Sequence, residues 1–322
     1  GASLLVMALG AGAFKPIPSG TIARITTKEN STLGFGIFYW SINLGAFIFP
    51  LFLVNWLKGI DWLFVFLLSG ACTGLMIFVA LLFYKEPPKP ESVKKLREVL
   101  VGAVTVLRDY KFVLMIFIYS GFWILYFQMF HTVLWYLKDF VDMAPVEGVV
   151  NGIAGIFGGG FAFKFDVEHV TVLNAGTIIL LQLIVSRIVS KTRALPTMIT
   201  GISLGTIGMV CLALSSYSWV FILGIVVFSI GEMTTHPKFI SYVGQIAPED
   251  KKALYMGYAF LYGVIGSSVG GLIGGYGYEF FVKQRGEPQV LWLLFSGIGL
   301  ATIIGLLLFD RLSIKKPAGA VS

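Results

Sequence analysis

The chain has 322 residues, of which 57% are hydrophobic and 13% are charged, and its formal net charge is +7. This apolar content arrives in runs of about 20 residues, the length that crosses a bilayer as a helix, and one soluble core would not bury it. The basic residues lie in short segments between the runs and form no arginine-rich tract. The composition therefore excludes a soluble nucleic-acid-binding protein and predicts a polytopic membrane protein.

Nine apolar runs are long enough to cross about 30 Å of hydrocarbon as helices. Cys72 and Cys211 each lie inside one of these runs, so we interpret them as small hydrophobic residues. We predict no metal site and no cofactor. The predicted fold is all-α, with spans at residues 1–23, 36–57, 62–84, 111–137, 170–190, 196–217, 219–244, 253–281 and 290–309.

A polar linker divides the nine runs into three and six. It begins with Pro87, Pro88 and Pro90, which stop a helix. From Ser92 onward, apolar residues recur at helical spacing beside basic ones, which is typical of an amphipathic helix on a membrane surface. We therefore predict a partial N-terminal helical bundle at 1–84, a cytoplasmic amphipathic linker at 85–110, and a six-helix C-terminal bundle with a cytoplasmic tail at 111–322.

The distribution of basic residues predicts the orientation. With alternate connections placed on one side of the membrane, 18 lysines and arginines fall on that side and 5 on the other. Basic residues near the ends of spans lie preferentially in the cytoplasm. We expect a multi-pass protein of the cell membrane, with the tail after Phe309 in the cytoplasm and residues 138–169 forming a mobile extracellular connection.

The second run, residues 34–50, carries Asn43 in its middle and Gly45 close by. Hydrocarbon offers no partner to an amide, so Asn43 is expected to face a partner helix or a wet cavity. Gly45 is expected to let a neighbouring backbone come close. Residues 38–46, FYWSINLGA, resemble the F-Y-x-x-I-N-x-G signature of the proton-dependent oligopeptide transporters, a branch of the major facilitator superfamily.

The resemblance covers essentially the whole chain. Residues 10–16, GAGAFKP, resemble the family's fourth-helix G-x-G-x-x-K-P, and Gly231-Glu232 resembles its tenth-helix G-E. The resemblance implies a major facilitator fold and proton-driven symport of di- and tripeptides by alternating access. It also implies that the family's first three helices, with their E-x-x-E-R motif, are absent from this chain.

Lys15 and Glu232 are charged residues that lie inside predicted spans, away from the span ends. A lysine at the centre of a span costs about 2.5 to 3.5 kcal/mol on insertion scales, so an intramembrane charge suggests a functional site by default. For Lys15, an alternative is that its long side chain snorkels, so that the ammonium reaches the membrane surface. His236 lies four residues after Glu232 on the same helix face, so each can stabilise the charged form of the other, and Pro237 loosens the backbone beside them.

The resemblance implies a role for each candidate site residue. A peptide would lie between two walls, with its carboxylate toward Lys15 and its ammonium toward Glu232. For Asn174, a polar residue at the membrane interface is an alternative. The resemblance implies proton coupling for Lys15 and Glu232. His236 stands where the family more commonly has a serine or an apolar residue, and we predict proton coupling for it from its spacing to Glu232. The substrate-binding residues implied are Lys15, Tyr39 and Asn43 on the N-terminal wall and Gln128, Asn174 and Glu232 on the C-terminal wall.

Other functions stay open. One is a carrier or exporter of another small amphipathic solute, and another is a non-transporting membrane sensor or scaffold. An enzyme is not expected, because the spans carry no H-E-x-x-H, G-x-S-x-G or paired-aspartate pattern. The partners we expect are a small peptide, protons and the lipid bilayer, with no nucleic acid, and we expect a monomer.

The charge asymmetry makes a testable prediction about topology. A cysteine placed at Ser92 should be shielded from a membrane-impermeant thiol reagent in intact cells, whereas one at Gly159 should react. The physical reason is the retention of basic segments in the cytoplasm. Labelling at Ser92 without labelling at Gly159 would reverse the orientation.

Overall fold

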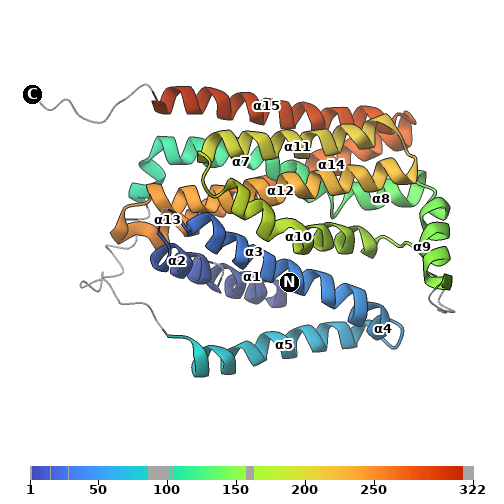
Figure 1. Cartoon of the computed structure of the whole chain (residues 1–322), viewed down its shortest axis with the longest axis horizontal. Helices are drawn as coiled ribbons and strands as arrows, with labels where there is room; N and C mark the ends of the chain where they lie inside the picture. The colour runs from blue at the N-terminus through green and yellow to red at the C-terminus, as the bar shows by residue number, and fades with distance from the viewer. Residues whose placement is uncertain are drawn as a thin grey trace, which may run out of the picture.

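The computed structural model describes residues 2–14, 16–27, 29–85, 102, 104–156 and 163–314, and these are almost entirely helical, with no strand among them. Figure 1 shows two groups of helices that run roughly along one direction. The first group contains α1 (Ala2–Phe14), α2 (Pro16–Ile25), α3 (Ser31–Ile48), α4 (Asn55–Lys58) and α5 (Trp62–Phe83). The second contains α7 (Tyr110–Gln128), α8 (Thr132–Phe140), α9 (Ala144–Ile156), α10 (Glu168–Val189), α11 (Ala194–Leu214), α12 (Ser218–Ile246), α13 (Lys252–Ala259), α14 (Leu261–Gly277) and α15 (Pro288–Ile314).

The predicted spans are confirmed. Within the described part of the chain, nine helical segments are long and apolar enough to cross a membrane, and each overlaps one predicted run. Short irregular turns extend two of them, a π-helical turn at Phe49–Val54 after α3 and another at Tyr278–Gln284 after α14. The all-α polytopic class predicted from composition therefore holds. Residues 86–101 lie outside the described residues, so the linker and the three-part division stay predictions.

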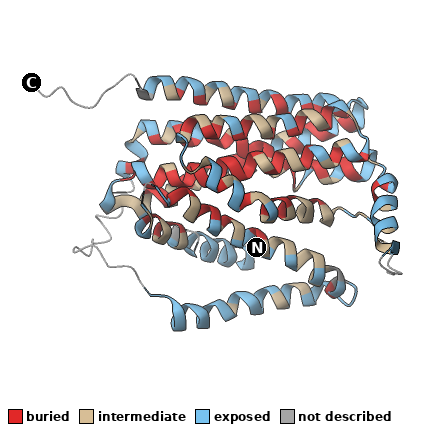
Figure 2. Cartoon of the chain, in the orientation of Figure 1, coloured by how far each residue is buried: buried red, intermediate tan, exposed pale blue. Residues whose placement is uncertain are grey.

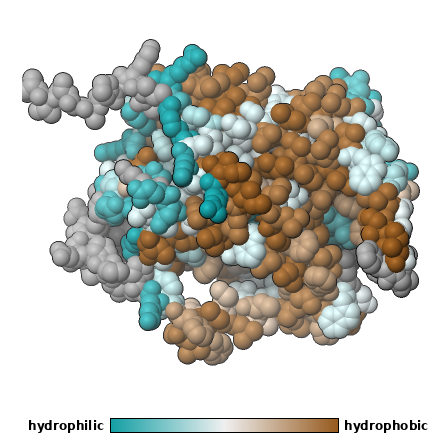
Figure 3. Space-filling view, in the orientation of Figure 1, coloured by the Kyte–Doolittle hydropathy of each residue, from teal (hydrophilic) through white to brown (hydrophobic). Residues whose placement is uncertain are grey.

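The buried core lies in the second group. Large side chains such as Tyr119, Phe122, Phe228 and Trp292 are almost fully enclosed there, whereas α1 and α5 have no buried residue. Figure 2 shows this contrast, and Figure 3 shows an apolar surface over much of the molecule, with hydrophilic residues gathered toward one end. An apolar exterior of this kind suits contact with lipid, because the hydrocarbon is as apolar as the side chains.

Helix α3 connects the two groups by packing against α10 and α12. A Cβ added to Gly36 would overlap the hydroxyl of Ser186 on α10, and one added to Gly176 of α10 would lie 3.0 Å from the ring of Phe47. The prediction for Gly45 was wrong, because nothing lies within 4 Å of a Cβ at that position. The close approach of α3 is made instead at Gly36, on the side that faces α10.

Two spans are interrupted where hydropathy predicts continuous runs. Between α7 and α8, the amides of Met129, Phe130 and His131 bond carbonyls three residues back, at 3.0 to 3.1 Å, which winds the chain into a tighter turn. Between α13 and α14, the amide of Phe260 does the same with the carbonyl of Gly257 at 3.3 Å. An apolar run predicts that a segment is stable in lipid. It does not predict whether the backbone forms a regular α-helix or a tighter turn.

The connection at residues 138–169 is more ordered than the sequence predicts, because it contains α9. The Asn151 side chain on α9 accepts a hydrogen bond from the amide of Phe163 at 2.5 Å and donates one to its carbonyl at 3.0 Å. Glu147, one turn earlier, accepts from the amide of Phe165 at 2.8 Å. The described part of this connection therefore contains a helix whose side chains bond the segment that follows it, while the mobility and the extracellular side of the connection stay predictions.

The tight contact of α11 with α12 makes a prediction about stability. A Cβ on Gly208 would lie 2.7 Å from the carbonyl oxygen of Gly224 and 2.9 Å from the Cβ of Phe228, so Gly208→Ala should lower the unfolding free energy by about 1 to 3 kcal/mol. Gly271→Ala on α14 is the matched control, because nothing lies within 4 Å of its Cβ and alanine favours the helix. Unfolding in mixed detergent micelles measures both. Equal stability of the two variants would contradict the packing of α11 on α12.

Candidate functional site

Glu232 lies in the middle of α12 and is fully buried, at 0% exposure. Its carboxylate meets helices on two sides. Oε1 accepts a hydrogen bond from the hydroxyl of Tyr39 on α3, and Oε2 accepts one from Nδ2 of Asn174 on α10 at 2.9 Å. The same Asn174 nitrogen lies 2.8 Å from the hydroxyl oxygen of Ser229, one turn before Glu232. The structure therefore brings together three residues that the sequence predicted for the site.

The donors on Glu232 are neutral. Among the residues that the structure describes, no lysine, arginine or histidine forms an ion pair with this carboxylate. Taking a carboxylate out of water is unfavourable by several kcal/mol, and neutral hydrogen bonds offset only part of that cost. The described part of the site therefore offers Glu232 hydrogen-bond donors but no opposite charge.

His236 lies one turn beyond Glu232 but has different partners. Its Nδ1 lies 3.3 Å from the hydroxyl oxygen of Tyr119, and its ring makes edge contacts with Tyr39 and Trp123 at centroid distances of 4.9 and 5.1 Å. The predicted pairing with Glu232 is thus indirect, because Tyr39 contacts both residues, through its hydroxyl and through its ring. His236 lies in an aromatic wall beside the carboxylate.

The other predicted site residues lie in different places. Asn43 is buried, and its Nδ2 donates to the carbonyl of Tyr39 on its own helix at 2.9 Å. Gln128 joins a separate polar cluster, in which its Nε2 donates to the carbonyls of Ile124 and Gly270. That cluster ties α7 to α14. Lys15 lies outside the described residues, so its role stays a prediction.

Pro237 leaves one carbonyl of α12 without its usual partner, and α10 supplies a replacement. A proline has no N–H, so the carbonyl of Met233 receives no bond from the residue four positions later. Nε2 of Gln182 donates to that carbonyl at 3.2 Å and also to the hydroxyl of Ser186 at 2.7 Å. Helix α12 continues through Pro237 to Ile246. This role of Gln182 was not identified from the sequence, because its bond to the proline-freed carbonyl depends on how α10 packs against α12.

Lys238 also contacts α10, and this contact was not identified from the sequence. It lies within α12 and is buried. Its Nζ donates to the carbonyls of Val189 and Ser190 at 2.8 and 3.3 Å. A cation at a helix C-terminus satisfies free carbonyls and the helix dipole. Its position inside the helical run beside Pro237 was the signal for a capping role.

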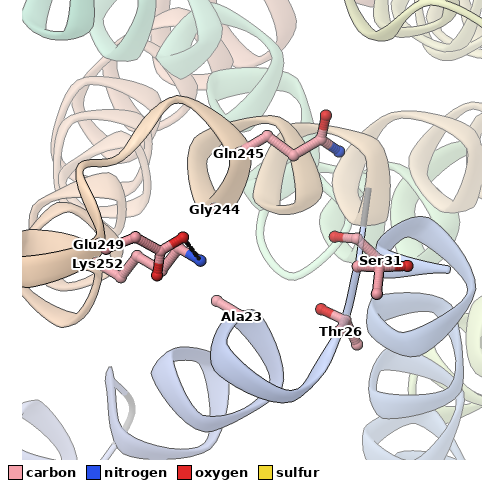
Figure 4. Close-up of a pocket in the computed structure, with 8 residues that line it drawn as sticks. Ala23, Thr26, Ser31, Gly244, Gln245, Glu249 and Lys252 are labelled. Atoms are coloured by element: carbon pink, nitrogen blue, oxygen red, sulfur yellow. Dashed lines mark ion pairs between the residues drawn. The ribbon is translucent and has the colours of Figure 1, made fainter. Parts of the chain in front are cut away.

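A cavity of about 240 Å³ lies away from Glu232, where the loop between α2 and α3 meets α12 and α13. Figure 4 shows Thr26 and Ser31 on one side and Gln245, Glu249 and Lys252 on the other, with the last two ion-paired at 2.8 Å. None of the predicted site residues lines it. The cavity therefore marks one end of the contact between the two groups of helices rather than the candidate site.

A helical membrane protein with a charged residue buried between two groups of spans belongs to the class of membrane transporters. The chain belongs to the Major Facilitator Superfamily, whose family model matches residues 2–166 and 164–320. This confirms the predicted fold class.

Known proteins with similar sequences are named for multidrug resistance. The chain is 24% identical over 312 residues to "Multidrug resistance protein MdtH" of Escherichia coli (strain K12 / DH10B), with 94% of this chain and 70% of that protein covered. It is also 24% identical over 310 residues to the protein of the same name from Klebsiella pneumoniae (strain 342), with the same coverage. These relatives support the superfamily.

Solved structures with the same fold come from another branch. A POT family transporter in complex with thioalcohol conjugated peptide superposes with a TM-score of 0.62 at 20% identity, covering 95% of this chain and 74% of that one. A POT family transporter in complex with 5-aminolevulinic acid gives 0.59 at 20% identity, covering 92% and 72%. At this identity the likeness shows the fold.

The bond from Gln182 to Met233 predicts an energetic coupling between two helices. Gln182→Leu should lower the unfolding free energy by about 1 to 3 kcal/mol, because it leaves a buried carbonyl without a donor. In a Pro237→Ala background the carbonyl regains its helical N–H, so the same change should cost less. Unfolding in mixed detergent micelles measures the unfolding free energy of the unmodified protein, the two single variants and the double variant.

Gln245→Leu provides the control for this cycle. Gln245 also lies on α12, but its Nε2 donates to the hydroxyl of Ser241 and not to the freed carbonyl. Its effect should be the same with either residue at position 237. An additive result for Gln182 and Pro237 would show that the glutamine does not compensate for the proline.

Proposed function

We propose that this chain acts in a proton-coupled carrier of di- and tripeptides that works by alternating access. The peptide ammonium would bind Glu232 and Asn174, and Lys15 would hold the carboxylate at the other end. The observation that carries the proposal is the fully buried carboxylate of Glu232, which has only neutral donors among the described residues and lies where α3 meets α10 and α12.

An ammonium suits this carboxylate for two physical reasons. It brings the charge that the site lacks, and a charge-assisted hydrogen bond is roughly twice as strong as a neutral one. It also offers three donors, so it can bond Glu232 and still satisfy a second acceptor. A solute without a cation would leave the buried charge uncompensated, which disfavours its binding.

The proposed proton-coupling residues are Lys15, Glu232 and His236. A proton on Glu232 neutralises the same carboxylate that an ammonium would neutralise, so the two are alternatives at one group. Symport requires both at once, and the proton that travels with the peptide would then reside on another group. His236, whose ring lies 4.9 Å from that of Tyr39, and Lys15 are the proposed positions for it.

A second candidate is an exporter of cationic amphipathic solutes, which the similarity to the MdtH proteins favours. If solute and proton take turns on Glu232, solute binding releases a proton, and the coupled process is exchange. If the proton resides elsewhere, binding releases none. A pH-sensitive dye in weakly buffered solution, with dialanine added to the full-length protein, distinguishes the two: release of about one proton per peptide favours exchange.

Neutralising the carboxylate tests the ammonium site. Glu232→Gln keeps the shape and the hydrogen bonding but removes the charge, and breaking a buried charge pair costs about 3 to 5 kcal/mol. Dialanine binding to the full-length protein, measured by calorimetry, should therefore fall below detection. Acetylated dialanine has no ammonium and should bind poorly to both proteins.

Glu279→Gln is the matched control for this measurement. Glu279 is exposed and pairs with Lys283 at 3.2 Å, outside the candidate site, so its neutralisation should leave dialanine binding unchanged. Equal affinity of the unmodified protein and Glu232→Gln for dialanine would remove Glu232 from the binding site and, with it, the peptide proposal.

A further inference from the structure

Tyr39 and Glu232 lie on opposite sides of the seam between the two groups of helices. We define the seam as the contact of α3 with α10 and α12. Of the two hydrogen bonds on the carboxylate, the one from Asn174 stays within the second group, because α10 and α12 both belong to it. The bond from Tyr39 on α3 crosses the seam.

The other polar contacts across the seam are neutral. Near the start of α3, the hydroxyl of Ser241 lies 2.8 Å from that of Ser31 and 3.3 Å from that of Thr32. Further along, Nε1 of Trp40 donates to the carbonyl of Ile179 at 2.9 Å. Among these described contacts, the one between Tyr39 and Glu232 involves an ionisable acceptor, so it is the contact whose strength a change of charge alters most.

The phenol hydroxyl fills one of the two acceptor positions of Oε1, and its ring lies beside that oxygen, so a ligand's ammonium would compete with it for the carboxylate. A buried carboxylate that loses a donor without gaining another is left with an unmet acceptor, which is strongly unfavourable. Glu232 therefore keeps Tyr39 until a better donor replaces it. Removal of the phenol from Oε1 also removes the charged contact between α3 and α12.

We propose that Tyr39 is an internal competitor for the substrate's cation, so that binding at Glu232 and release of the seam are one event. This inference rests on the proposed function for the identity of the ligand and deepens it by assigning how the site is regulated. A cationic solute, or a proton on Glu232, displaces or weakens the phenol contact and thereby frees α3 from α12. The seam stays closed while Glu232 has neither a bound cation nor a proton.

The proposal reverses the expected effect of removing the Tyr39 hydroxyl. A residue that binds substrate loses affinity when truncated, whereas a competitor gains it. Tyr39→Phe keeps the ring and its contact with His236 and deletes only the hydroxyl. We expect it to tighten dialanine binding by about tenfold, the scale of one hydrogen bond to a charged group.

The control for losing a buried phenol is Tyr136→Phe. The Tyr136 hydroxyl donates to the carbonyl of Leu212 at 3.3 Å, within the second group and away from the seam. Its removal should leave dialanine affinity unchanged. Unchanged or weaker binding by Tyr39→Phe would overturn the proposal, because the hydroxyl would then be neutral or a substrate contact.

The distance between the two groups of helices across the seam can be measured without any ligand. Spin labels at Trp56 on α4 and Leu180 on α10, both exposed, report the distance between the two groups. In the full-length protein we expect Tyr39→Phe to broaden that distance distribution toward longer values. Glu232→Gln should do the same from the other side of the contact, and Tyr136→Phe should not.

The two measurements separate this inference from the proposed function. A distance distribution that Tyr39→Phe leaves unchanged overturns the competitor proposal, whatever the peptide data show. Dialanine binding that survives Glu232→Gln overturns the peptide site, while the label distances still decide whether Tyr39 and Glu232 hold the seam. Melting temperatures of all variants establish that each is folded.

Discussion

The carboxylate of Glu232 is fully buried, and no cation among the described residues pairs with it. Buried charge is tolerated only with hydrogen-bond donors, and here they come from two different helices. This requirement specifies which face of α3 and which face of α10 turn toward α12. The contact between the two groups of helices and the candidate site are therefore the same place. Under the proposed function, a change of charge at Glu232 would act on both.

A second constraint is that hydrocarbon offers no partner to a free carbonyl, so each interruption of a helix must be satisfied from a neighbour. Helix α12 contains Pro237, and Gln182 of α10 donates a hydrogen bond to the freed carbonyl of Met233. In return, Lys238 of α12 holds the carbonyls at the end of α10. The two helices are thus joined on both sides of the proline. We infer that they move together and that the flexible boundary lies at the α3 seam.

The fold alone does not distinguish the two candidate functions, because the chain is similar both to a protein named for multidrug resistance and to a POT family transporter in complex with a conjugated peptide. The difference lies in chemistry at a few positions. A carboxylate that receives either a proton or a cation supports exchange, whereas symport needs a second place for the proton. His236, with Tyr119 at 3.3 Å and aromatic rings on two sides, is the neighbouring residue whose protonation would decide between them.

The sequence by itself determined the all-α class, the nine spans and the inward-facing polar residues Asn43 and Glu232, because transfer into lipid depends on composition and run length, whereas for Asn174 it left a place at the membrane interface open. The sequence did not determine which side chains contact one another. Only the tertiary structure placed Tyr39 on Glu232, moved Gln128 into the contact between α7 and α14, replaced Gly45 by Gly36 as the point of close approach, and showed Lys238 as a cap. Each of these depends on how helices distant in the sequence turn toward one another, and a local pattern of apolar residues carries no information about that rotation.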